Sequence, residues 1–148
     1  MIKGIRSIVF TDYDRGSLQL LEVNAKANCN ITTCNYEVKY LEWGHHPEET
    51  SYYNLILGTD LLYSIDIVEP LFQTVAYYLR QSEKSYEGRK ALFLLASSFD
   101  IGKDIENKVQ ESIQRFNIVS REIVPLDLTQ QSPICRIQYF TLETISSL

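Results

Sequence analysis

The stretch YNLILGTDLLY, at residues 53–63, joins a short apolar run to the polar groups that follow it. Leu55–Leu57 predict a strand that is buried on both faces, as in the interior of a parallel sheet. Gly58 lets backbone or a ligand approach closely, and Asp60 and Tyr63 follow where the strand ends. Ligands of open α/β sheets bind at the carboxyl ends of the strands. We therefore expect a ligand site at this edge.

Apolar runs and helical stripes alternate through the rest of the chain. Ser17 is expected to cap the first helix. Strands that alternate with helices imply right-handed crossovers and a Rossmann-like, doubly wound, mostly parallel α/β sheet. The last two strands have no helix between them, which predicts a terminal antiparallel pair. The expected strands are residues 5–10, 36–41, 55–57, 91–96, 118–124 and 135–142, and the expected helices are residues 17–28, 65–80 and 105–116.

The composition favours a single domain with one core, because the chain has 148 residues of which 45% are hydrophobic. The formal net charge is −5 and no cluster of Lys or Arg stands out, so we expect no nucleic-acid partner. No apolar run approaches the roughly 20 residues that span a bilayer, and no secretion signal opens the chain. We therefore expect no membrane partner and a cytoplasmic location, with the nucleus as the alternative. Cys29, Cys34 and Cys135 lack disulfide or zinc spacing, so we expect no metal.

Three segments in this order resemble one known family. Residues 9–12 are Val-Phe-Thr-Asp and lead into a helix that carries Asn24 and Asn28. Residues 41–44 are Leu-Glu-Trp-Gly, and residues 55–63 run from the apolar strand through an Asp-x-x-Tyr pair. In this order the segments are similar to those of the seven-strand, S-adenosylmethionine-dependent methyltransferases, and within them the methyltransferase-like protein-lysine methyltransferases. The resemblance implies S-adenosylmethionine as the cofactor.

The resemblance also implies that a part of the family's fold is missing. In such enzymes the first strand lies at the centre of the sheet and ends in a glycine-rich loop around the amino-acid end of the cofactor. Here the first strand corresponds to the family's second. We therefore expect an incomplete methyltransferase fold over residues 1–148, either truncated at its N-terminus or completed by a partner chain or oligomer. No such loop is formed by the glycines, which are at positions 4, 16, 44, 58, 88 and 102.

The cofactor-binding residues follow from the matching positions. Asp12 is implied to accept hydrogen bonds from the ribose hydroxyls, with Asp14 as the competing candidate. Trp43 is implied to cover the adenine ring, and the backbone of Gly58 and Thr59 to line the same pocket. The structural alternatives are a turn or helix-capping role for Asp12 and a core position for Trp43.

The substrate residues are Asp60 and Tyr63, which match the family's Asp-x-x-Tyr signature. Methyl transfer from a sulfonium needs an unprotonated amine held in line with the methyl group. Asp60 is implied to hold and orient the substrate ammonium, and Tyr63 to complete a polar and aromatic cage around the nitrogen. The structural alternative is a helix N-cap at Asp60 and a packed tyrosine at Tyr63.

These observations predict an S-adenosylmethionine-dependent enzyme that N-methylates a lysine of a protein substrate. The alternative is a non-catalytic, degenerate methyltransferase fold that acts as a protein-interaction module. A nicotinamide-dependent dehydrogenase, with Asp12 on the ribose, leaves Trp43 and the Asp60–Tyr63 pair without a role.

Overall fold

The computed structural model describes residues 5–28, 35–45, 51–85, 90–123 and 136–143. Contacts divide the chain into two compact units, Met1–His45 and His46–Leu148, which we describe separately. The expectation of a single domain stays a prediction.

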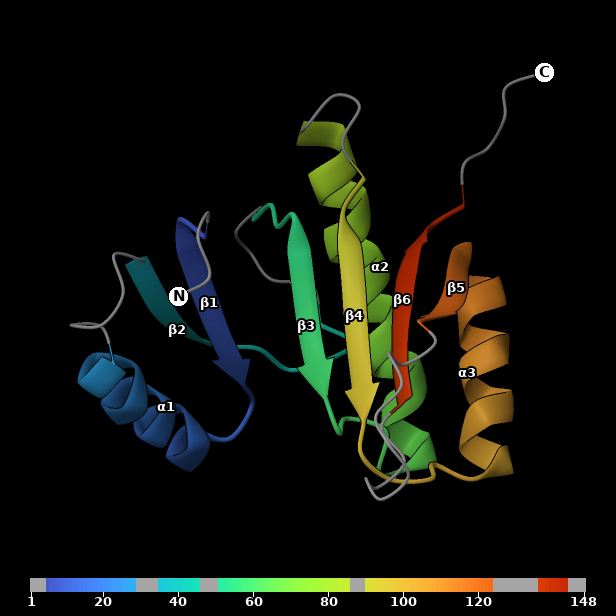
Figure 1. Ribbon diagram of the computed structural model, residues 1–148, viewed down its shortest axis with the longest axis horizontal. Helices are drawn as coiled ribbons and strands as arrows, with labels where there is room; N and C mark the ends of the chain where they lie inside the picture. Colours follow the sequence, from blue (N-terminus) through green and yellow to red (C-terminus); the bar gives the residue numbers. More distant parts are fainter. Residues whose placement is uncertain (1–4, 29–34, 46–50, 86–89, 124–135, 144–148) are drawn as a thin grey trace. The chain divides into compact units, whose positions relative to one another are not determined.

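The first unit contains two parallel strands and one helix (Figure 1). Strand β1 (Ser7–Asp12) pairs with β2 (Asn35–Tyr40) along its whole length. Helix α1 (Arg15–Asn28) joins the two strands, as the helical stripe predicts. Since parallel strands need a crossover connection, this unit is a β-α-β arrangement.

The cap of α1 differs from the expectation. The carboxylate of Asp14 accepts a hydrogen bond from the amide of Ser17 at 2.7 Å, and the carbonyl of Asp14 accepts the amide of Leu18. Asp14 is therefore the N-cap, and the assignment of Ser17 was wrong. The reason is register: the helix begins at Arg15, so Ser17 is already its third residue.

The second unit contains a four-stranded sheet in the order β3-β4-β6-β5 (Figure 1). Strands β3 and β4 are parallel, whereas β6 is antiparallel to both β4 and β5. The predicted terminal antiparallel pair is thus β5 and β6. The elements are β3 (Leu55–Thr59), the short 3-10 helix η2 (Ile65–Ile67), α2 (Val68–Ser85), β4 (Leu92–Ser97), α3 (Lys103–Arg115), β5 (Ile118–Ile123) and β6 (Arg136–Leu142).

The core of the second unit lies between α2 and one face of this sheet. Phe72 of α2 meets Phe93 of β4 and Phe140 of β6 edge-on, with ring centroids 6.3 and 5.2 Å apart. All three rings are almost completely buried. In Figure 1, α2 runs behind β4 and β6, as these contacts require. Its buried face contains Val68, Leu71, Phe72, Val75, Ala76, Tyr78 and Leu79.

Helix α3 covers the same face of the sheet. Val109 and Ile113 are buried, as the predicted stripe requires, and Arg136 of β6 pairs with Glu106 of α3 at 2.6 Å. Arg136 shares its sheet face with Phe140, because the two are an even number of residues apart. Both helices therefore pack on one side.

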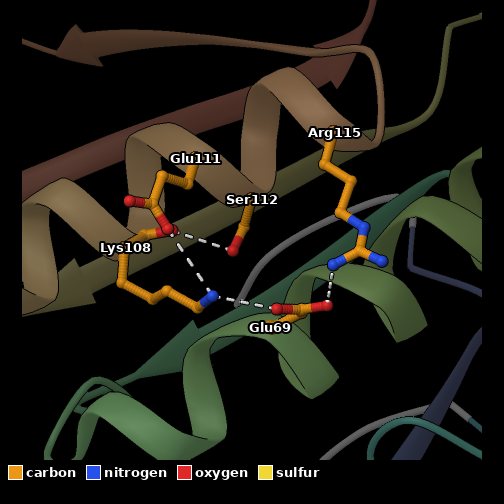
Figure 2. Close-up of polar contacts among 5 residues, drawn as sticks. All are labelled: Glu69, Lys108, Glu111, Ser112 and Arg115. Carbon is orange, nitrogen blue, oxygen red and sulfur yellow. Dashed lines mark hydrogen bonds and ion pairs between the residues drawn. The ribbon is translucent and has the colours of Figure 1, made fainter.

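Charged side chains join α2 to α3 (Figure 2). Glu69 of α2 accepts from Lys108 at 2.9 Å and also pairs with Arg115, both of which come from α3. Glu111 lies 3.6 Å from Lys108, and the hydroxyl of Ser112 donates to the carbonyl of Lys108. The glutamate is thus held by two cations from the neighbouring helix.

Strand β3 differs from the expectation of burial on both faces. The side chain of Leu55 is 45% exposed and that of Leu57 is 67% exposed. Only the face with Ile56 and Gly58 points toward α2, where Gly58 is buried. The expectation failed because both helices of this unit cover the other face of the sheet, and even in the central strand β4 the register partners Leu92 and Leu94 are only half-buried. The position of β3 at the edge of the sheet exposes its leucines further.

Candidate functional site

The carboxylate of Asp12 lies at the end of β1 and is half-buried. Its Oδ1 accepts the amide of Asp14 at 2.8 Å, and its carbonyl accepts the amide of Leu41 at 3.0 Å. Asp12 therefore holds the turn with one oxygen. Among the described residues no hydrogen bond engages its Oδ2. Asp14, the competing candidate, caps α1 through Oδ2, and no described residue engages its Oδ1, so both candidates stay open.

Trp43 lies in the turn that follows β2. The register pairs Asp12 with Tyr40, the last residue of β2, so this turn begins beside the end of β1. Trp43 is half-buried, and Gly44 after it has a φ of 87°, which favours glycine. The hydroxyl of Tyr40 donates to Glu42 at 2.9 Å, and this hydrogen bond raises the pKa of Tyr40. In the first unit, a carboxylate and an indole thus lie at the same end of the two strands.

Gly58 and Thr59 lie at the end of β3 in the second unit. A Cβ atom on Gly58 would lie 2.6 Å from Leu61 Cδ1 and 3.2 Å from Phe93 Cε2. Packing against these side chains therefore explains the glycine without a ligand. Thr59 is exposed. A cofactor contact from Gly58 and Thr59 stays a prediction.

Asp60 is fixed by the end of β4. Its amide donates to the carbonyl of Ala96 at 2.8 Å, and its Oδ1 accepts the amide of Ser98 at 2.7 Å. The residue has a φ of 54°, a left-handed conformation that aspartate tolerates better than most residues do. Asp60 is exposed, and among the described residues no hydrogen bond engages its Oδ2. This arrangement holds a carboxylate in one orientation with an oxygen toward solvent.

Tyr63 follows in the segment that leads to η2, and it is 62% exposed. The structure contradicts both alternatives for the pair. The N-cap of η2 is Ser64 rather than Asp60, and Tyr63 is not packed in the core. A carboxylate and a phenol are therefore accessible on one short segment.

Ser98 is the residue at this site that sequence reasoning missed as a partner of Asp60. It is separated from Asp60 by 38 positions, so no local pattern connects the two. The available signal was the small polar pair Ser97-Ser98 after an apolar strand, where a neighbouring parallel strand also ends.

The described residues contain neither a cluster of metal-ligating side chains nor a helix that could cross a membrane. No group of three or more His, Cys, Asp or Glu side chains there is arranged to hold a metal ion. No described helix has both the length and the apolar character needed to cross a bilayer.

Solved structures show which class of fold this is. A SAM-dependent methyltransferase from Methanosarcina mazei aligns with a TM-score of 0.62 at 11% identity, covering 92% of this chain and 82% of that one. The methyltransferase domain of the bacterial protein CtHen1 aligns with a TM-score of 0.56 at 13% identity, covering 94% and 78%. The fold is that of the methyltransferases, as predicted.

The sequence also identifies a particular family within this fold. Residues 2–94 match the sequence model of a family described as lysine methyltransferase, which is more than half of the chain. The chain belongs to this family. A comparison with curated proteins gave no match.

Membership of this family confirms the predicted cofactor, S-adenosylmethionine. The first unit fits two parts of that molecule. The Oδ2 of Asp12 at a strand end, which no described residue engages, suits ribose hydroxyls, and the half-buried indole of Trp43 suits an adenine ring. These roles stay predictions for both residues.

Proposed function

We propose that this methyltransferase acts on the side-chain amine of a lysine in a protein substrate. The observation that carries the proposal is the exposed carboxylate of Asp60, fixed by Ala96 and Ser98 and followed by the exposed Tyr63. The family description, lysine methyltransferase, supports the same substrate class.

S-adenosylmethionine, when bound, supplies a methyl group on a positively charged sulfur. The residues of this chain must then hold an amine in line with that group. A lysine side chain has a pKa of about 10.4 in water, so it arrives as an ammonium and must release a proton to solvent before its nitrogen can accept the methyl group. Asp60 attracts the ammonium through Oδ2, while the bond from Ser98 to Oδ1 prevents the carboxylate from turning away. The ring of Tyr63 adds an attraction for the cation.

The charge of the chain supports a protein partner of this kind. Its formal net charge of −5 attracts lysine-rich segments and repels nucleic acids. We therefore propose a protein substrate, without nucleic-acid or membrane partners, and a cytoplasmic enzyme.

Asp60→Asn is the sharpest test of this proposal. Asparagine tolerates the left-handed backbone and retains an oxygen for the Ser98 amide, so only the charge is lost. With radiolabelled S-adenosylmethionine and a library of lysine-containing peptides, we expect methylation of lysine to fall by about 100-fold. Asp66→Asn, in the exposed first turn of η2, is the matched control.

Two outcomes would contradict the proposal. One is an Asp60→Asn protein that methylates lysine at the wild-type rate. The other is a label that wild type places only on residues other than lysine.

The non-catalytic interaction module is favoured by a different observation, the exposure of Leu55 and Leu57 on β3. Titration of the chain with S-adenosylhomocysteine separates the two functions. A micromolar Kd, about −8 kcal/mol, supports the enzyme. No binding by a folded sample supports the module.

A further inference from the structure

A pocket with a volume of about 340 Å³ lies in the second unit, between α2 and the C-terminal end of α3. Tyr77, Arg80 and Lys84 line it from α2, and Arg115 and Phe116 line it from the end of α3. None of its lining residues is a candidate site residue, and none belongs to the buried face of α2. Pockets for small molecules have volumes of about 300–1,000 Å³. The pocket is therefore a second concave surface of a size that suits a small ligand.

The pocket is positively charged, although the chain has a formal net charge of −5. Three cations line it, Arg80, Lys84 and Arg115, whereas Glu69 is its one acidic residue among those that the structure describes. The carboxylate of Glu69 is already held by Arg115 and by Lys108 (Figure 2). Glu69 therefore leaves the charges of Arg80 and Lys84 to attract an anion.

Arg80 is held in place across the two helices. Its Nη2 donates to the carbonyl of Phe116, the C-cap of α3, at 2.7 Å. Among the described residues no hydrogen bond or ion pair engages its Nε or Nη1. A guanidinium presents its N–H groups in one plane, where they match the oxygens of a phosphate or carboxylate. Arg80 therefore offers donors that are already oriented.

Lys84 lies one helical turn after Arg80, on the same face of α2. The side chain of Lys84 is exposed, and no described carboxylate pairs with its ammonium. Two like charges at this spacing repel each other. An anion between the two side chains replaces that repulsion with an attraction to both.

Tyr77 and Phe116 give the pocket an aromatic part. Both are half-buried, and they come from different helices. The ring of Tyr77 packs edge-on against that of Tyr78, with the centroids 5.4 Å apart, so its orientation is fixed. Aromatic side chains favour a flat ring as a neighbour. The pocket thus combines two cations with a surface for a ring.

We propose that this pocket binds a small molecule that joins a phosphate group to a flat ring, as a mononucleotide does. The phosphate lies between Arg80 and Lys84, and the ring lies beside Tyr77 and Phe116. A phosphate monoester carries close to two negative charges at neutral pH, which matches two cations that have no described carboxylate partner. The inference uses only residues outside the candidate site, so it does not depend on the proposed activity.

The first test is a titration of the full chain with uridine monophosphate, followed by heteronuclear NMR of the backbone amides. Uracil differs from adenine, so this probe is a poor analogue of S-adenosylmethionine. We expect a Kd of about 1 mM or lower, with the largest shifts at the amides of residues 77–84, Arg115 and Phe116. Uridine, which lacks the phosphate, should bind at least about 10-fold more weakly. Inorganic phosphate should shift the same amides at higher concentrations, because it lacks the ring.

The second test compares three variants under the same titration. Lys84→Gln removes one charge without breaking a described contact and should raise the Kd about 3-fold or more. Arg80→Gln should raise the Kd about 10-fold, because it removes hydrogen bonds between two charged groups. Lys103→Gln, at the exposed first residue of α3, is the matched control and should leave the Kd unchanged. Lys84→Gln keeps the test decisive if Arg80→Gln loosens the contact with Phe116.

Three results would overturn the proposal. The first is a folded wild-type chain whose pocket amides do not shift at about 10 mM uridine monophosphate. The second is uridine that binds as tightly as the monophosphate. The third is a Kd that Lys84→Gln raises no more than Lys103→Gln does.

Discussion

The two units are built from the same kinds of element but bury their side chains very differently. In the second unit α2 and α3 cover one face of a four-stranded sheet, and Phe72, Phe93 and Phe140 are almost fully buried. In the first unit no residue of α1 is buried, and Leu20 and Val23 are more than 60% exposed. Every described hydrophobic residue of the buried core belongs to the second unit.

The difference shows how burial depends on the width of a sheet. Two strands and one helix expose most of their apolar surface, and an isolated pair of strands is marginally stable at best. Four strands with two helices can surround a set of rings on all sides. We therefore expect the stability of the chain to come from the second unit, and substitutions in the two units to differ in their cost.

The largest expected effect is in the aromatic core. Phe93→Ala should lower the free energy of unfolding by about 3–5 kcal/mol, because it removes a ring that is 1% exposed and leaves a cavity against Phe72 and Phe140. Urea denaturation followed by far-ultraviolet circular dichroism measures the change.

Leu20→Ala in α1 is the matched control for the core substitution. It should change the free energy of unfolding by no more than about 0.5 kcal/mol, because Leu20 is already 62% exposed. Equal losses in the two variants would contradict the difference between the units.

A smaller effect is expected at the start of α1. Asp14→Ala removes the acceptor for the amide of Ser17 and should destabilise the helix by about 1 kcal/mol. Because none of the described residues in the first unit is buried, the loss should appear as faster hydrogen exchange of the α1 amides. Ser17→Ala tests the sequence-based expectation that Ser17 caps α1. If Ser17→Ala frays the helix as much as Asp14→Ala does, the cap assigned by the structure is wrong.

The fold was predictable where a pattern is local. The helical spacing of Val109 and Ile113 predicted α3, and the lack of a helical stripe in the sequence between the last two expected strands predicted their antiparallel pairing. Burial was less predictable, since it depends on neighbours. An apolar run such as Leu55–Leu57 is the same whether one or both faces of its sheet are covered, and here the described helices of the unit cover one face of a sheet in which β3 is an edge strand.

The candidate site was predictable as a set of positions but not as a set of contacts. Asp60 stood out because it follows an apolar strand. Its support by Ser98 depends on the pairing of β3 with β4, which lies beyond any local window. Asp12 and Asp14 looked alike in the sequence, and only the structure shows that Asp12 closes the turn after β1 whereas Asp14 caps α1.

The smallest expected effect comes from the ion pairs between α2 and α3. The hydrogen bond from Lys108, with the charge of Arg115, holds the pKa of Glu69 below its ordinary value. The same hydrogen bond raises the pKa of Lys108. The unfolded chain therefore binds a proton at Glu69 more readily than the folded chain does. This stabilisation is complete above the ordinary pKa of glutamate and is lost as the pH falls through the lowered value.

Glu69→Gln should remove that part of the pH dependence. Between neutral pH and about pH 3, the free energy of unfolding of wild type should fall slightly more than that of the variant. Urea denaturation at each pH measures the difference. Glu37→Gln in the first unit is the matched control, because its ion pair with Lys39 lies within β2 and joins no two elements. A wild-type curve parallel to that of Glu69→Gln would show that these exposed ion pairs orient the helices without stabilising them, and that α2 and α3 are held together by the apolar residues beneath.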